Sequence, residues 1–110
     1  MAGIYARTDV ARGVHKAPAN DVIWSIRGFE LAISRREQDI LNPLNINVLR
    51  AFPGRGNRVW GARVLTSDSA WRYVSVRRLF LMIEESIDEA TQWVVFEPND
   101  EPLWAQIRQW

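Results

Sequence analysis

The sequence contains no cysteine in its 110 residues, which excludes disulfide bonds, thiol catalysis and thiolate-bound metals. It contains one histidine, His15, so a metal site built from several histidines is excluded as well. An excess of one charge is also missing, because 14 basic residues accompany 13 acidic ones and the net charge is +1. This balance gives no indication of a protein built to bind nucleic acid or an anionic membrane.

Long hydrophobic runs are absent too. No window approaches the roughly 20 apolar residues that a transmembrane helix needs, and residues 1–12 lack the apolar segment of a signal peptide. We therefore expect a soluble chain that carries no signal peptide. The length of 110 residues is enough for one small domain and too few for two. Hydrophobic residues make up 47% of the chain, so this domain can form a core.

Tryptophan is the residue type that is unusually frequent, with 6 copies. They stand at Trp24, Trp60, Trp71, Trp93, Trp104 and Trp110. Large aromatic side chains dominate both protein cores and protein interfaces. A domain of this size can hardly bury all of them alone, so we expect some to contact a partner. The alternative is a tryptophan-rich core.

The first third of the chain offers weak patterns. Residues 1–19 show no sustained helical period, and we expect them to form an extended arm or linker. Asn20 is a candidate N-cap for a short helix that ends at Gly28. Residues 29–33 alternate between apolar and other side chains, as in a strand.

The middle of the chain carries clearer signals. Ser34 and Glu37 fit a capping box, which predicts a helix over residues 35–41. Residues 46–52 and 58–65 read as two strands joined by a turn rich in glycine. Together they predict an antiparallel hairpin.

The strongest helical pattern covers residues 76–90, after a brief strand expected at 71–74. The apolar face of this helix comprises Val76, Leu79, Phe80, Ile83 and Ile87. Residues 93–96 form a continuous apolar run that is typical of a buried strand. A final helix is expected to be capped by Asn99 or Asp100. Its apolar face comprises Leu103, Ile107 and Trp110. These elements predict an α+β domain, with a small antiparallel or mixed sheet and helices packed on one side.

Candidates for enzymatic chemistry are few. His15 has no evident catalytic partner, so a packing or surface role is favoured over catalysis. One acidic group has the spacing of a solvated helix face, which is favoured over a cation site. This group consists of Glu84, Glu85, Asp88 and Glu89. The sequence therefore predicts neither an enzyme nor a bound cofactor or metal.

The loop at residues 54–58, Gly-Arg-Gly-Asn-Arg, resembles a phosphate-binding loop only superficially. It lacks the lysine and the Ser/Thr of a P-loop, so a hairpin turn with exposed arginines is favoured. The pairs Arg35-Arg36 and Arg77-Arg78 do not form a continuous basic stripe. Nucleic-acid binding is therefore the weaker alternative.

The predicted long helix carries its charges in the reverse of the order that the helix dipole favours. Arg77 and Arg78 stand at its N-terminus, whereas Asp88 and Glu89 stand at its C-terminus. Either the chain tolerates a small electrostatic cost, or these charges are placed for a partner. In the second case, reversing the charges of Arg77 and Arg78 weakens assembly and leaves the fold intact. The residues predicted for a subunit or tube interface are Arg77, Arg78, Asp88, Glu89, Arg55 and Arg58.

Four stretches, in this order, carry a resemblance to a known family. They are residues 13–20, 37–43, 46–63 and 76–100. The most specific parts are Val59-Trp60-Gly61-Ala62-Arg63 and Phe96-Glu97-Pro98-Asn99. From Gly3 to Trp104, the chain resembles the C-terminal region of the sheath protein of contractile tails, which is found in phages, R-type bacteriocins and related injection systems.

The resemblance implies a structural subunit that needs no catalysis and no cofactor. Subunits of such a sheath stack around an inner tube, the matching region faces the tube, and contraction drives the tube outward. Extended chain ends add strands to the sheets of neighbouring subunits. The implied partners are further copies of the chain, the tail tube protein, and baseplate and tail terminator proteins, with no nucleic acid and no membrane insertion. The implied location is the tail sheath of a virion or particle that is assembled in the bacterial host cytoplasm.

The resemblance also implies a division into an N-terminal arm, residues 1–19, and a tail sheath C-terminal-type domain, residues 20–110. This domain is expected to be incomplete at its C-terminal end, and the chain is interpreted as a fragment or truncated copy. The alternative is a stand-alone nucleic-acid- or protein-binding α+β domain. Salt-dependent binding to oligonucleotides would favour that alternative, whereas assembly into rings or tubes would favour the sheath.

Overall fold

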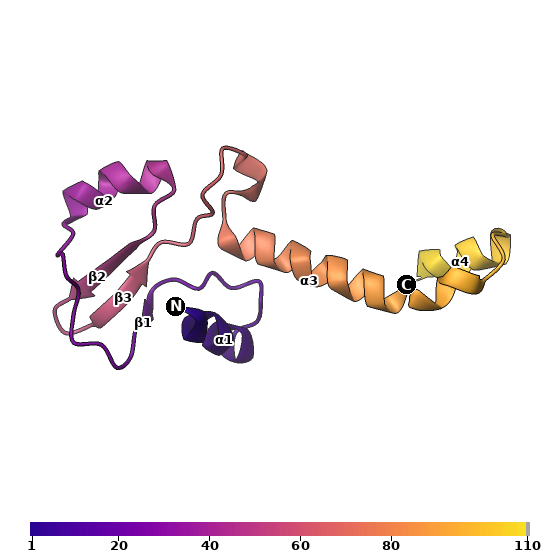
Figure 1. Ribbon diagram of the computed structural model, residues 1–110, viewed down its shortest axis with the longest axis horizontal. Coiled ribbons are helices and arrows are strands. Elements are labelled where there is room, and N and C mark those ends of the chain that lie inside the picture. The colour runs from indigo at the N-terminus through magenta and orange to yellow at the C-terminus, as the bar shows by residue number, and fades with distance from the viewer. Residues whose placement is uncertain (110) are drawn as a thin grey trace. The chain divides into compact units, whose positions relative to one another are not determined.

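The computed structural model describes residues 1–109 and divides the chain into two compact units, Met1–Leu79 and Phe80–Trp110. The helices and strands of the first unit are α1 (Ala2–Ala11), β1 (Asp21–Val22), α2 (Arg35–Leu41), η1 (Asn42–Leu44), β2 (Val48–Phe52), β3 (Gly56–Trp60) and η2 (Ser69–Trp71). Helix α3 (Val74–Ala90) begins in the first unit and ends in the second, where η3 (Gln92–Phe96) and α4 (Glu101–Gln109) follow. Figure 1 shows these elements along the chain.

Three strands form one antiparallel sheet in the order β1-β3-β2, which confirms the predicted α+β class. The predicted hairpin is confirmed as well, with pairing that runs from Val48 opposite Trp60 to Phe52 opposite Gly56. Gly54 occupies the turn with φ 72°, a left-handed conformation that glycine adopts without a steric penalty. Strand β3 ends at Trp60, whereas the predicted strand extends to residue 65.

The predicted short helix after Asn20 is wrong, because the backbone there pairs with β3. Asn20 donates to the carbonyl of Val59, and Ile23 donates to the carbonyl of Asn57, both at 2.8 Å. Asn20 also has φ 55°, in the left-handed region that asparagine tolerates better than most residues. Pairing with an open sheet edge therefore overrides a helical pattern that only a few residues support.

The predicted extended conformation of residues 1–19 is also wrong, since α1 occupies most of this segment. Its buried side chains, Ile4 and Thr8, lie one turn apart on the same face of the helix. Gly13, with φ 99°, ends the helix, and its amide donates to the carbonyls of Thr8 and Asp9. One member of the buried pair is polar, so the segment shows no hydrophobic period.

Three further predicted strands are absent from the described residues. Residues 29–33 form no regular element, and residues 71–74 contribute only an isolated bridge between Arg63 and Tyr73. The apolar run at 93–96 belongs to η3, and its last side chain, Phe96, is 97% exposed. Residues 29–33 do alternate and residues 93–96 are continuously apolar, but within residues 1–109 neither segment pairs with a strand.

The helices predicted from capping signals and periodicity are confirmed. In α2, the amide of Glu37 donates to Ser34 Oγ at 3.3 Å, and the amide of Ser34 donates to Glu37 Oε2 at 2.6 Å, which completes the capping box. Helix α3 covers the predicted range and starts two residues earlier. Asp100 Oδ1 accepts from the amide of Leu103 at 3.1 Å and so caps α4. The predicted apolar face of α4 includes Trp110, which lies outside the described residues.

The buried apolar core is small. Within residues 1–109 it consists of Ile4, Val48 and Val59 in the first unit and Leu103 in the second. Polar contacts join the helices to the sheet, because Gln38 of α2 donates to the carbonyl of Trp60 at 3.0 Å and Arg7 of α1 donates to Val22 at 2.7 Å. No helix among residues 1–109 is both long enough and apolar enough to cross a bilayer.

Candidate subunit interface

The six charged residues predicted for an interface fall into three separate groups. The start of α3 carries Arg77 and Arg78, and the hairpin carries Arg55 and Arg58. The part of α3 that belongs to the second unit carries Asp88 and Glu89. The structure therefore places Arg77 and Arg78 side by side on one helix and Arg55 and Arg58 in one hairpin, while Asp88 and Glu89 belong to the other unit.

Arg78 is engaged within the chain by α1. Its guanidinium donates to both carboxylate oxygens of Asp9, at 2.7 and 2.6 Å, and lies 4.9 Å from the centre of the Tyr5 ring. The hydrogen bonds from Arg78 lower the pKa of Asp9 below its ordinary value, and the same contact raises the pKa of Arg78. This two-point contact fixes α1 against the first turns of α3.

Arg77 lies on a neighbouring aromatic ring. Its guanidinium is 4.9 Å from the centre of the Trp71 ring, which belongs to η2. Such cation–π contacts contribute about 0.5–1 kcal/mol at exposed sites. Arg77 and Arg78 thus have local contacts that offset their unfavourable position near the helix N-terminus.

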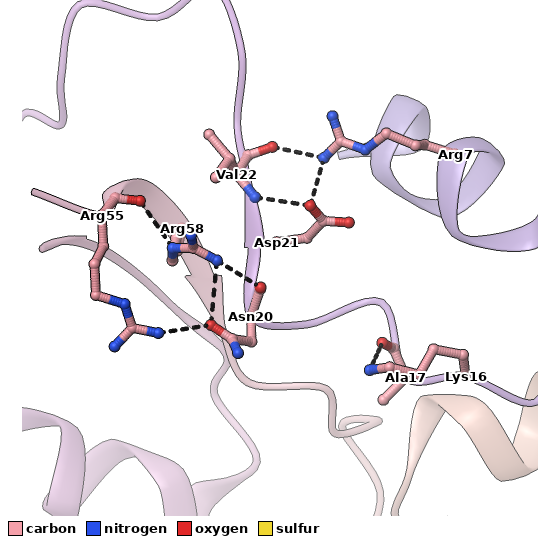
Figure 2. A network of polar contacts seen from close by, with 8 residues as sticks. All are labelled: Arg7, Lys16, Ala17, Asn20, Asp21, Val22, Arg55 and Arg58. Carbon is pink, nitrogen blue, oxygen red and sulfur yellow. Dashed lines mark hydrogen bonds and ion pairs between the residues drawn. The ribbon is translucent and has the colours of Figure 1, made fainter. Parts of the chain in front are cut away.

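Arg58 and Arg55 connect the hairpin to the residue that precedes β1 (Figure 2). Arg58 donates to the backbone carbonyls of Arg55 and Asn20, each at 2.9 Å. Arg55 reaches the side-chain oxygen of Asn20 at 3.4 Å and lies over the rings of Phe52 and Trp60 at 5.5 and 5.7 Å. These arginines therefore hold Asn20 in its left-handed conformation beside the sheet.

Asp88 and Glu89 have a different environment, because both side chains are exposed. Within residues 1–109, neither carboxylate forms an ion pair. The Asp88 backbone carbonyl accepts from Thr91 Oγ1 and from Gln92 Nε2 at the end of the helix. The carboxylates of Asp88 and Glu89 are thus available to a partner.

Sequence reasoning missed the partners of the arginines. Asp9 and Tyr5, which contact Arg78, lie in the segment that was expected to be extended. Arg7 and Asp21 form a second ion pair at 2.8 Å that joins α1 to β1, as Figure 2 shows. No local pattern could reveal the Asp9–Arg78 contact, since 69 residues separate the two side chains.

The outer edge of β2 borders an apolar groove. Within residues 1–109, β2 forms its strand pairing with β3 alone, so its other edge has no strand partner. A cavity of about 320 Å³ lies at the start of β2, between residues 29–33 and residues 46–49. Its lining includes Phe29, Leu31, Ile33, Leu41, Ile46, Val48 and Leu49. An open strand edge beside an apolar groove is suited to accept an additional strand.

The second unit exposes most of its large apolar side chains. Among residues 80–109 they are Phe80, Leu81, Met82, Ile83, Ile87, Trp93, Val95, Phe96, Trp104 and Ile107. Only Leu103 is buried in the same part of the chain. Of the tryptophans at residues 1–109, none is buried, so a tryptophan-rich core is ruled out for this part of the chain. Extended apolar exposure of this kind marks an interaction surface.

The segment Val59-Trp60-Gly61-Ala62-Arg63 has a structural explanation. The side-chain amide of Asn47 accepts from the Arg63 amide and donates to the Arg63 carbonyl, both at 2.8 Å. A β-carbon on Gly61 would lie 3.1 Å from the Asn47 Cα atom, so the backbone passes too close for a larger residue. Glycine and asparagine together direct the chain away from the end of β3.

The segment that ends in Asn99-Asp100 sets up the last helix. Asn99 Oδ1 accepts from Trp104 Nε1 at 2.8 Å, while the Asp100 carboxylate caps the first turn of α4. The preceding Phe96 remains exposed. The same few residues thus begin a helix and present an apolar side chain to the solvent.

The described residues hold no cluster of metal-ligating side chains. Within residues 1–109, no three side chains of histidine, cysteine, aspartate or glutamate converge as metal ligands. His15 is exposed in the loop after α1. The surfaces built for contact are therefore the β2 groove, the charged groups and the exposed apolar side chains of the second unit.

Two family models match consecutive parts of the chain. The model of the phage tail sheath protein central domain matches residues 1–65, and that of the phage tail sheath C-terminal domain matches residues 66–109. Both models describe domains of phage tail sheath proteins. The chain belongs to the phage tail sheath family.

Individual relatives agree with this assignment. The tail sheath protein of Vibrio phage KVP40 is 33% identical over 105 residues, which cover 92% of this chain and 16% of that protein. The helical sheath of the anti-feeding prophage in its contracted state has a TM-score of 0.92 and 44% identity, and the match covers 98% of this chain and 30% of that one. A contracted sheath complex of the extracellular contractile injection system PVC has a TM-score of 0.91 and 41% identity, with coverage of 98% and 31%. The chain therefore spans less than a third of the length of these relatives.

Proposed function

We propose that this chain is a structural part of a contractile tail sheath, that it stacks with further copies around an inner tube, and that contraction of the sheath drives the tube outward. The exposed apolar surface carries the proposal, because 20 large hydrophobic side chains are exposed and 4 hydrophobic side chains are buried within residues 1–109. A chain with so much apolar surface is suited to burial against partners rather than to a free existence. Its similarity to contracted sheaths of two injection systems supports the same role.

The β2 edge provides a place where a neighbouring subunit can add a strand. Main-chain hydrogen bonds give such an interaction its strength, and the apolar groove beside the strand accommodates side chains. Chain ends of neighbouring copies are the proposed donors. In this chain the segment before Asn20 forms α1 instead, so it must leave that helix before it can act as an extended arm.

The proposed partners are further copies, the tail tube protein, and baseplate and tail terminator proteins. The charged residues named above are proposed to contact a neighbouring subunit or the tube; Asp88 and Glu89 suit this role best because both are exposed and unpaired in residues 1–109. The proposed role needs no catalysis, no cofactor and no nucleic acid. The proposed location is a particle sheath that is assembled in the bacterial cytoplasm.

Co-assembly tests the proposal directly. The tagged chain is expressed together with the sheath and tube proteins of the anti-feeding prophage, and purified particles are examined by immunogold electron microscopy. We expect the tag along the sheath. A tag that is absent from every particle, together with salt-dependent binding of the chain to mixed oligonucleotides, would contradict the sheath function and favour a nucleic-acid-binding domain.

A further inference from the structure

The charges of the chain are segregated between its two units. Residues 1–79 contain 13 arginines and lysines against 6 aspartates and glutamates, whereas residues 80–110 contain 1 against 7. The total of +1 therefore conceals a first unit of net charge +7 and a second unit of −6. Complementary charges steer association and select its orientation. Two copies are thus attracted when the first unit of one faces the second unit of the other.

A basic hollow lies beside α1 in the first unit. It has a volume of about 510 Å³, and its lining includes Arg7, Arg12, Lys16 and Asp21. Arg7 neutralises Asp21 at 2.8 Å, which leaves Arg12 and Lys16 as uncompensated cations. Figure 2 shows Lys16 turned toward the carbonyl of Ala17, to which its Nζ donates at 3.2 Å. Within residues 1–109, neither Arg12 nor Lys16 forms an ion pair.

An acidic stretch on α3 supplies the complementary charges. It consists of Glu84, Glu85, Asp88 and Glu89, all exposed in the second unit. Glu84 stands four residues before Asp88, and Glu85 four before Glu89, so like charges repel along the helix surface. The helix dipole opposes negative charge at this end as well. A cationic partner relieves both sources of unfavourable energy.

We propose that the acidic stretch of one copy docks in the basic hollow of the next copy. The contact joins two different surfaces, so every added copy leaves one hollow and one acidic stretch open for the next. Such head-to-tail association propagates into rings or helical arrays. The inference rests on the proposed sheath function and specifies the residues by which copies recognise one another.

Charge exchange between two variants of the full chain tests this docking. Arg12→Glu/Lys16→Glu reverses the hollow, and Glu84→Lys/Asp88→Lys reverses the acidic stretch. By sedimentation velocity at low salt, we expect the unmodified chain to self-associate and each variant alone to do so about tenfold more weakly. An equimolar mixture of both variants should associate again, because opposite charges then meet between different molecules. Association of the unmodified chain should weaken about tenfold when salt rises toward about 0.3 M, since screening shortens the reach of exposed charges.

Arg27→Glu/Arg72→Glu is the matched control. It reverses two positive charges of the same unit, as the hollow variant does, but at exposed positions outside the hollow. We expect this control to associate like the unmodified chain, and circular dichroism verifies that every variant is folded. An unmodified chain that stays monomeric, a mixture that does not recover association, or a control that is as weak as the hollow variant would each overturn the docking. The proposed function is judged separately: immunogold labelling of sheaths by both the unmodified chain and Arg12→Glu/Lys16→Glu would refute the docking alone.

Discussion

The chain leaves the hairpin at Gly61, where the structure has little space for a side chain. A β-carbon there would lie 3.0–3.3 Å from three atoms of Asn47, one of them backbone. The side chain of Asn47 cannot move aside freely, because it bonds to the Arg63 backbone at both its oxygen and its nitrogen. The close approach of Gly61 and the hydrogen bonds to Arg63 therefore both restrict the atoms of Asn47.

We predict that Gly61→Ala lowers the free energy of unfolding by about 1–3 kcal/mol, the usual cost of forcing an extra carbon into a packed site. Urea denaturation followed by circular dichroism measures the change. Gly28→Ala is the control, since nothing lies within 4 Å of a β-carbon at that exposed position. Equal stability of the Gly61 variant and the unmodified chain would show that the backbone shifts at little cost.

A few polar contacts hold helix α1. Among them, the Asp9–Arg78 ion pair joins the two residues that are farthest apart in sequence. We predict that Asp9→Asn lowers the melting temperature at neutral pH and that the difference from the unmodified chain disappears in acid. The pKa of Asp9 is lower in the folded chain than its ordinary value of 3.8, so the pair stabilises above that value. Its contribution is lost as the pH falls through the lowered pKa.

Thermal denaturation at several pH values, from neutral to strongly acidic, measures this dependence. Asp39→Asn is a suitable control, because Asp39 is exposed and forms no ion pair within residues 1–109. A difference between Asp9→Asn and the unmodified chain that persists unchanged in acid would mean that Asp9 acts through packing or helix propensity and not through its charge.

The elements that the sequence predicts well are those with local signals. The capping box at Ser34, the glycine turn of the hairpin and the period of α3 each act within a few residues. Helix α1 could not be predicted, because its buried pair of Ile4 and Thr8 contains only one apolar side chain. Strand β1 depends on β3, far away in sequence, and the apolar run at 93–96 has no period that separates strand from helix.

The candidate interface shows the same limit. The sequence could identify Arg77, Arg78 and Asp88 from their positions along one helix. Each of them carries the charge opposite to the one that the helix dipole favours at that end. Their partners could not be named. Asp9 is 69 residues from Arg78, and which arginines have partners within the chain depends on how α1 and the hairpin pack.

At the scale of the whole molecule, apolar exposure links the fold to assembly. Phe96 is 97% exposed, so it contributes little to the stability of the isolated chain. We predict that Phe96→Ser changes the free energy of unfolding by less than about 0.5 kcal/mol, as is usual for surface positions. The same substitution should reduce incorporation into sheaths by about tenfold, since loss of an aromatic anchor commonly costs more than 1 kcal/mol of binding.

Denaturation curves and the immunogold count per particle give the two readouts for this variant. Leu65→Ser serves as the control, because Leu65 is 81% exposed but lies outside the apolar surface of the second unit. Normal incorporation of Phe96→Ser would remove this side chain from the interface. A marked loss of stability would show that it packs within the chain.

The separation of 69 residues between Asp9 and Arg78 also determines when α1 docks during folding. The hairpin of β2 and β3 closes a short turn, and such hairpins form in about 1–10 μs. Contacts between distant residues require a large loop to close first, so their formation is delayed. We expect the Asp9–Arg78 contact, which joins α1 to α3, to form after the hairpin. The Asp9 carboxylate would then be available to other molecules while the hairpin is already complete.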